Sequence, residues 1–78
     1  MITVYTINDC IWCRKVKKYL LQKNIDFKEI NIEEDQEAAT ECERISGGVT
    51  VPVTTDGNLV AVSFQKSIID QMIENNKI

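Results

Sequence analysis

The first 32 residues alternate strand-like and helix-like stretches, and this order constrains the fold more than any other feature of the chain. Residues 2–7 and 25–32 are rich in β-branched and aromatic side chains, which favours β-strands. Between them, apolar residues recur at helical spacing over residues 11–24. A strand–helix–strand unit places its strands parallel, with a right-handed crossover. The N-terminal part of the chain therefore predicts a βαβ unit.

The rest of the chain predicts a helix, a hairpin and a closing helix. Residues 35–46 have an apolar helical face and are followed by two glycines, which commonly end helices. Asp56-Gly57 separates two short apolar runs and is typical of a hairpin in which both turn positions have positive φ. A last apolar stripe predicts the closing helix, and its members are Phe64, Ile68, Ile69, Met72 and Ile73.

These elements fit one α/β domain that covers residues 1–78 in the order βαβ–α–ββ–α. We expect a minimal four-stranded mixed sheet, with a parallel pair from the first unit and antiparallel strands from the hairpin. Three helices should cover both faces of this sheet. A chain of 78 residues buries about 60% of its unfolded surface, so the predicted core is modest but sufficient.

Charge and composition exclude several classes of function. The net charge of −3 gives no electrostatic reason to expect nucleic-acid binding. The apolar runs are too short to span a membrane, and residues 1–5 lead directly into a strand pattern rather than a signal peptide. The three cysteines are an odd number, unlike the even set of a small secreted scaffold. This count favours a reducing, cytoplasmic compartment.

A close cysteine pair, Cys10-Ile11-Trp12-Cys13, stands where the first predicted strand ends and the first helix begins. Thiol–disulfide exchange requires a thiolate, and a helix N-terminus directs unpaired N–H groups and the positive end of the helix dipole at Cys10. A pKa lowered from about 8.5 to about 6 would make the thiolate the dominant form at neutral pH. Cys13, one turn later, is placed to attack a mixed disulfide formed at Cys10.

A basic run follows this pair and consists of Arg14, Lys15, Lys17 and Lys18. Cations in the first turns of a helix oppose its dipole, at a cost of roughly a few tenths of a kcal/mol each. One interpretation is that they stabilise a nearby anion. The alternative is an ordinary solvated face.

Metal binding and a structural disulfide are the alternatives for the close pair. The chain has no histidine and its only other cysteine is Cys42, so a zinc site would need ligands from two chains. A disulfide across so short a loop would constrain little of the unfolded chain. Cys42 shares a helical stripe with Ala38 and Ile45 and is predicted to be a packing residue of the core.

Pro52 is informative because its missing N–H interrupts a strand ladder at the start of the predicted hairpin. It follows Thr50 and Val51. One interpretation is a plain edge-strand proline. The other is a cis proline packed against the reactive thiol, which leaves the backbone of Val51 free to pair with an extended substrate.

With Cys-x-x-Cys after the first strand, Thr50-Val51-Pro52 before the hairpin and helices in this order, the chain resembles a glutaredoxin over essentially its whole length. The resemblance implies a thioredoxin fold. It also implies that Cys10 is the nucleophile, that Cys13 is the resolving thiol and that Pro52 is cis. The residues expected to contact the substrate are Trp12, Thr50, Val51, Pro52 and Phe64.

The segment Val62-Ser63-Phe64-Gln65-Lys66 departs from the glutaredoxin pattern. Many glutaredoxins have there a Gly-Gly pair and an acidic couple that hold the γ-glutamyl end of glutathione, and a basic residue where Ile7 stands. Phe64 is instead expected to extend an apolar patch with Trp12 and Val51 around Cys10, which suits a protein partner. Lys66 could still meet a glutathione carboxylate.

The stretches Tyr5-Thr6 and Asn8-Asp9-Cys10, together with Phe64, resemble the NrdH-redoxin branch. Redoxins of that branch reduce ribonucleotide reductase and are recharged by thioredoxin reductase. We therefore expect a monomeric, cytoplasmic protein disulfide oxidoreductase. It would act as an electron carrier without a bound cofactor or metal. Its electrons would come from thioredoxin reductase or, less favourably, from glutathione. The alternatives are a dimeric metal or iron–sulfur carrier that uses Cys10, and a non-catalytic adaptor whose cysteines switch a surface.

Overall fold

The computed structural model describes residues 2–48 and 51–75, and its elements follow the predicted order. They are β1 (Ile2–Thr6), α1 (Ile11–Gln22), β2 (Phe27–Asn31), α2 (Gln36–Ser46), β3 (Val53–Thr55), β4 (Val60–Val62) and α3 (Lys66–Asn75). The prediction of a four-stranded mixed sheet with three helices is confirmed. Among the described residues, no helix combines the length and the apolar character that crossing a bilayer requires.

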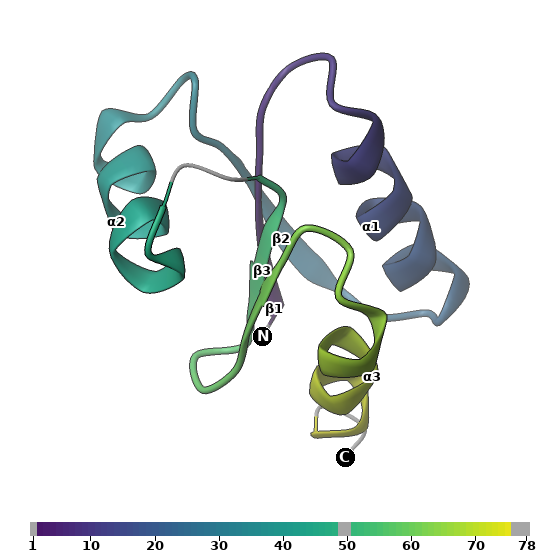
Figure 1. Cartoon of the computed structure of the whole chain (residues 1–78). Helices are drawn as coiled ribbons and strands as arrows, with labels where there is room; N and C mark the ends of the chain where they lie inside the picture. Colours follow the sequence, from purple (N-terminus) through teal and green to yellow (C-terminus); the bar gives the residue numbers. More distant parts are fainter. Residues whose placement is uncertain (1, 49–50, 76–78) are drawn as a thin grey trace.

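The sheet has the strand order β2-β1-β3-β4, which places β1 in its interior (Figure 1). β1 runs parallel to β2, with Ile2 beside Phe27 and Thr6 beside Asn31. β1 is antiparallel to β3, and β3 is antiparallel to β4, as the hairpin pattern predicts. The chain leaves the end of this central strand and reaches the cysteine pair four residues later, at the start of α1. The cysteine pair is thus attached to the best-supported strand of the sheet.

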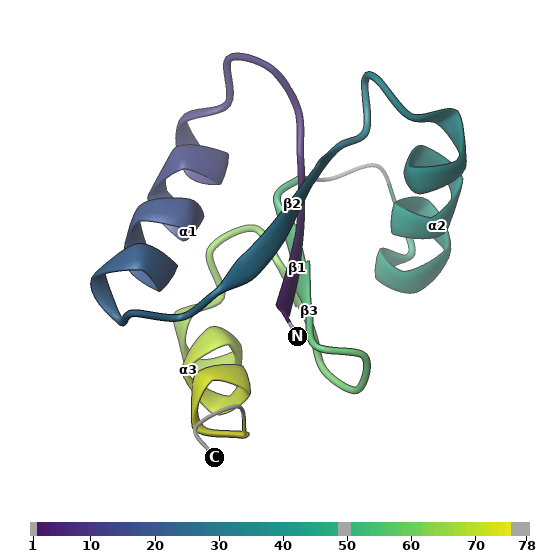
Figure 2. The same cartoon turned by 180° about the vertical axis from the view of Figure 1, so that it is seen from behind.

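Helices cover both faces of the sheet, as predicted: α1 and α3 lie on one side and α2 on the other (Figures 1 and 2). Side chains along β1 alternate between the two faces of the sheet. Ile2 and Val4 therefore pack with α1 and α3, while Tyr5 packs with α2. The larger core cluster consists of Ile2, Val4, Val16, Leu20, Ala61, Ile69, Met72 and Ile73. The smaller one consists of Tyr5, Ala38, Cys42 and Val53.

The regular elements are shorter than the predicted ranges at several ends. Ile7 lies past the end of β1, so the predicted strand over residues 2–7 is one residue too long. The helix predicted over residues 11–24 ends at Gln22, and Asn24 has a φ of +57°. A right-handed helix cannot continue through a left-handed residue. The strand predicted over residues 25–32 likewise contracts to Phe27–Asn31.

The hairpin is confirmed, but the prediction of two positive φ angles at Asp56-Gly57 is wrong. Of these two residues only Gly57 has a positive φ, at +100°. The strands pair as far as Thr55 and Val60, so the loop has four residues rather than two. The Asp56 carboxylate accepts hydrogen bonds from the N–H groups of Asn58 and Leu59, at 2.9 and 2.8 Å. This side-chain turn replaces the backbone turn that the dipeptide predicts.

The closing helix begins later than its apolar stripe indicates. Phe64 precedes α3, which starts at Lys66. Ser63 has a φ of +59°, and the Gln65 side chain accepts a hydrogen bond from the N–H of Val62 at 2.8 Å. This turn makes Phe64 part of the connection from β4 rather than the first residue of the helix.

Candidate functional site

Cys10 is the N-cap residue of α1. Its backbone is extended, with φ −110° and ψ 112°, and its carbonyl accepts a hydrogen bond from the N–H of Arg14 at 3.2 Å. Its sulfur accepts a hydrogen bond from the N–H of Cys13, with an N–Sγ distance of 3.1 Å. The thiol therefore occupies the place that a serine or aspartate oxygen takes in an ordinary N-cap. This sulfur is partly accessible at the N-terminus of the helix.

Cys13 lies on the first turn of α1 and faces the interior, with 2% of its surface exposed. Burial and the hydrogen bond with Cys10 raise the pKa of the Cys13 thiol to about 11. This pKa is lowered in part by a hydrogen bond with the backbone of Ile7 and by the charge of Lys17. Cys13 is therefore a protonated, protected thiol at neutral pH, whereas Cys10 is accessible. Cys13 is the more buried of the two thiols.

The loop before Cys10 is held by polar side chains to the end of β2 and to the loop after it, and the partners Asn31 and Glu33 were not predicted from the sequence. The N–H of Asn8 donates to the Glu33 carboxylate at 2.9 Å, and the Asn31 amide donates to the Asn8 side chain at 2.9 Å. The N–H of Ile32 also donates to the carbonyl of Thr6 at 2.9 Å. These contacts position the loop that ends at Cys10. The pairing of segments over 20 residues apart leaves no local signal, although both loops are polar.

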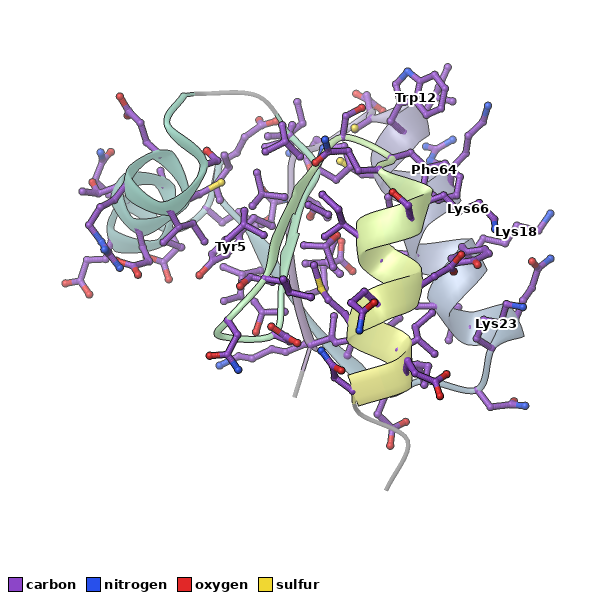
Figure 3. The ribbon with its side chains drawn as sticks, turned by 60° about the horizontal axis from the view of Figure 1, so that its bottom comes forward. Tyr5, Trp12, Lys18, Lys23, Phe64 and Lys66 are labelled. Atoms are coloured by element: carbon purple, nitrogen blue, oxygen red, sulfur yellow. The ribbon has the colours of Figure 1, made fainter. Side chains whose placement is uncertain are left out.

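The residues between the two cysteines face solvent. Ile11 is 68% exposed and Trp12 is 50% exposed. The Lys15 ammonium lies over the Trp12 ring, 4.3 Å from its centroid. Figure 3 shows Trp12 at one end of the molecule, above the outer side of α1. Two large apolar side chains are therefore exposed at the start of α1, directly after Cys10 in the sequence.

Pro52 is buried directly before β3, and the Val51–Pro52 peptide bond is cis, as the resemblance implies. Its carbonyl accepts a hydrogen bond from the N–H of Ser63 at 2.8 Å. Because β3 lies between β1 and β4, the alternative of a proline on an edge strand is wrong. Val51 is partly buried against the cluster on the α2 side of the sheet. Thr50 lies outside the described residues, so its role stays a prediction.

Phe64 packs in the core on the α1 and α3 side, with its ring 5.6 Å from that of Tyr19 in an edge-on arrangement. Val51 belongs to the cluster on the other face of the sheet. Figure 3 shows this separation, with Phe64 at the start of α3 and Tyr5 of the second cluster toward α2. The two members of the expected apolar patch are thus packed on different faces, and a substrate contact of Phe64 stays a prediction.

Lys66 is engaged by neighbouring side chains. Its ammonium forms an ion pair with Asp70 at 3.1 Å and lies 5.5 Å from the centroid of the Tyr19 ring. The Tyr19 hydroxyl also donates a hydrogen bond to Asp70. This hydrogen bond raises the pKa of Tyr19 and lowers the pKa of Asp70, whose carboxylate Lys66 stabilises further. The three side chains tie α1 to α3.

Cys42 is 1% exposed on α2, and burial raises the pKa of its thiol. Its predicted place in the core is confirmed. In the described ranges, residues 2–48 and 51–75, no group of three or more histidine, cysteine, aspartate or glutamate side chains could hold a metal ion. The Cys10 and Cys13 pair, an accessible thiol beside a buried one, has the geometry that thiol–disulfide exchange requires.

Comparisons with known proteins place this geometry in a family. The glutaredoxin family model matches residues 2–60. A glutaredoxin-like 8.6 kDa protein of the rubredoxin operon of Clostridium pasteurianum is 43% identical over 75 residues, which cover 95% of this chain and 99% of that protein. The glutaredoxin-like protein NrdH of Escherichia coli strain K12 is 35% identical over 71 residues, which cover 91% of this chain and 86% of that protein.

A solved structure agrees with these relatives. The NrdH-redoxin of Escherichia coli, described as a glutaredoxin-like protein with a thioredoxin-like activity profile, superposes with a TM-score of 0.80 at 34% identity. The superposition covers 91% of this chain and 92% of that chain. The predicted thioredoxin fold is confirmed. With its cysteine pair at the start of α1 and relatives that include NrdH proteins, the chain belongs to the glutaredoxin family of thiol–disulfide oxidoreductases.

Proposed function

We propose that this protein is a dithiol electron carrier that reduces protein disulfides through Cys10 and Cys13. The observation that carries the proposal is the geometry of the pair. An accessible sulfur caps α1, and a buried thiol lies one turn below it, with its N–H donating to that sulfur at 3.1 Å. A partly accessible nucleophile with a protected resolving thiol is the arrangement that two-step exchange needs.

The reaction takes place in two displacements. The Cys10 thiolate attacks one sulfur of the substrate disulfide; a Cys10–substrate bond forms, the substrate S–S bond breaks, and the other substrate sulfur leaves as a thiolate. Cys13 then loses its proton and attacks the Cys10 sulfur, which releases the second substrate thiolate. The protein dithiol is oxidised to a disulfide and the substrate disulfide is reduced to a dithiol. The Cys13 proton goes to one substrate thiolate, and the other takes a proton from water, which received the Cys10 proton when the attacking thiolate formed.

The side chains around Cys10 favour a protein substrate. Ile11 and Trp12 are exposed beside the sulfur, and large apolar side chains around a reactive atom suit a polypeptide partner. The resemblance to NrdH-redoxins makes ribonucleotide reductase one substrate to test. Pro52 and Val51 precede β3, where an extended substrate strand could add its backbone hydrogen bonds.

Trapping tests the division of labour between the two thiols. Cys13→Ser should stop the second displacement and accumulate a stable mixed disulfide at Cys10, visible by non-reducing electrophoresis and mass spectrometry. Cys42→Ser is the matched control, because Cys42 lies on α2 in the opposite core cluster; this variant should turn over normally. A mixed disulfide located at Cys42 in Cys13→Ser, or at Cys13 in Cys42→Ser, would contradict the proposal.

For the reductant, we propose a thioredoxin reductase rather than glutathione. In place of flexible glycines and acids, residues 62–66 contribute a packed Phe64 and a Gln65 side chain that already accepts the N–H of Val62. The one basic side chain of the segment, Lys66, is paired with Asp70. A ligand that must compete with these contacts loses about 1–3 kcal/mol for each unmet polar group.

A parallel assay tests this choice. The oxidised protein should be reduced efficiently by thioredoxin reductase with NADPH and slowly by glutathione with glutathione reductase. Lys66→Gln should leave both rates nearly unchanged, since the Lys66 ammonium is already bound to Asp70. A glutathione-coupled rate equal to that of an ordinary glutaredoxin would overturn the choice of reductant. Loss of that rate in Lys66→Gln would then identify Lys66 as a glutathione contact.

A further inference from the structure

We propose that the outer face of α1 binds an acidic segment of the substrate protein next to the disulfide that Cys10 attacks. This inference rests on the proposed function and names the chemistry of its partner. α1 combines two independent properties beside the reactive sulfur, namely its positive charge and its exposed apolar side chains.

The charge of the molecule is divided between the two sides of the sheet. The chain has a net charge of −3, yet all charged residues of α1 are basic, namely Arg14, Lys15, Lys17 and Lys18. The acidic residues concentrate at α2 and the loop before it, where residues 33–43 include six of them. α1 and α2 cover opposite faces of the sheet (Figures 1 and 2). The basic residues of α1 and the acidic residues around α2 therefore lie on opposite sides of the protein.

The cationic side chains of α1 are available to a partner. Arg14, Lys15 and Lys18 are exposed, whereas Lys17 is paired with Glu29 on β2 at 2.9 Å. Figure 3 shows Lys18 and, beyond the end of the helix, Lys23 directed away from the sheet. Of the cations on this face, Arg14 and Lys15 oppose the dipole of α1 at its start, which destabilises the free helix slightly. A bound anion would remove that cost.

Exposed apolar side chains share this face. Within the described part of the chain, the large hydrophobic residues that are exposed are Ile11, Trp12 and Leu21, and all of them lie on α1. At about 1.5 Å per residue, the helix from Ile11 to Leu21 extends about 15 Å from the Cys10 end. A peptide of a few residues on one side of a disulfide reaches that far. The face therefore fits a segment that combines carboxylates with some apolar contact.

Electrostatics also disfavour a basic partner. A basic segment would meet the α1 cations beside Cys10, while an acidic one would be steered toward α1 and away from the acidic side at α2. Exposed ion pairs contribute little individually, so the expected effect is mainly on the rate of association and falls with salt.

Two synthetic peptides test the proposal on the reduced protein. Both carry the same internal disulfide and length, and the disulfide is flanked by Asp residues in one and by Lys residues in the other. At low ionic strength the Asp peptide should be reduced about 10-fold faster, and the ratio should approach one at high salt. Arg14→Gln/Lys18→Gln should lower the ratio several-fold. Lys15 is left unchanged because it covers the Trp12 ring.

The matched control is Lys28→Gln/Arg44→Gln, which removes the same charge from β2 and α2. It should preserve the preference for the Asp peptide. Equal rates for the two peptides, or an equal loss of preference in both double variants, would overturn the inference and leave the proposed function standing. Failure to reduce either peptide would overturn the proposed function as well.

Discussion

α1 and α2 begin with the same hydrogen bond made by different chemistry. In α2 the Asp35 carboxylate accepts from the N–H of Ala38 at 3.1 Å. In α1 the Cys10 sulfur accepts from the N–H of Cys13, also at 3.1 Å. A carboxylate is a strong acceptor and favours a helix N-terminus, whereas a thiol is a weak one. The N-cap of α2 therefore stabilises its helix, and that of α1 presents a reactive group.

The charges of the two helices extend this contrast. α2 has Glu37 in its first turn and Arg44 in its last, both favourable to the helix dipole. α1 has no acidic residue in its first turn and places Arg14 and Lys15 near its start. Proteins commonly depart from local stability rules at functional sites. The start of α1 is thus the place where the local sequence departs most from what would stabilise its helix.

The largest expected effect separates the two roles of Cys10. Cys10→Ser and Cys10→Ala should both abolish disulfide reduction, because each removes the attacking sulfur. Serine is a good N-cap and alanine a poor one, so Cys10→Ser should be more stable than Cys10→Ala by about 1 kcal/mol. Insulin reduction and urea denaturation measure the two quantities. Residual exchange activity in either variant would show that another thiol is the nucleophile.

The pH dependence of alkylation distinguishes the two cysteines of α1 and its N-cap, Cys13 and Cys10. The raised pKa of Cys13, about 11, means that its reactive thiolate is a minor form at pH 8 and increases about tenfold with each unit up to that pKa. Iodoacetamide at pH 8 should therefore label Cys10 alone, and labelling of Cys13 should increase steeply toward pH 10. Mass spectrometry of peptides after timed quenching locates the label. Equal labelling of both cysteines at pH 8 in the folded protein would contradict the assignment.

The same raised pKa predicts a loss of stability in alkali. The unfolded chain releases the Cys13 and Cys42 protons near pH 8.5, while burial keeps both thiols protonated in the folded protein at that pH. The stabilisation is complete below about pH 8.5 and is lost as pH rises toward the folded-state pKa values. Denaturation midpoints measured from pH 7 to 10 should fall less in Cys42→Ala than in the unaltered protein. An equal fall in both would show that Cys42 does not contribute.

The smallest effect belongs to α2. Asp35→Ala removes a charged N-cap and should lower the free energy of unfolding by about 1 kcal/mol without changing the rate of disulfide reduction. Asp35→Asn, which retains a capping oxygen, should recover most of the stability. Chemical denaturation and the insulin assay are the measurements. A large loss of activity in Asp35→Ala would mean that α2 supports the cysteine pair more directly than the contrast implies.

Features set by short-range chemistry could be predicted well. The start of α1 at the cysteine pair and the end of α2 at Gly47, which has a φ of +78°, depend on residues within one helical turn. The burial of Cys42 also follows from periodicity along its own helix. The detailed turn at Asp56 could not be predicted, because a side-chain acceptor competed with the backbone turn that Asp-Gly favours.

The sequence by itself determined the order of the elements, their amphipathic faces and the cysteine pair at a strand-to-helix junction, since each depends on spacing along the chain. Only the tertiary structure decided that β1 lies inside the sheet, that Phe64 packs on Tyr19 and that Asn8 is held by Asn31 and Glu33. These contacts join residues far apart in sequence. Their partners are selected by the packing of whole helices and strands, and no local propensity specifies them.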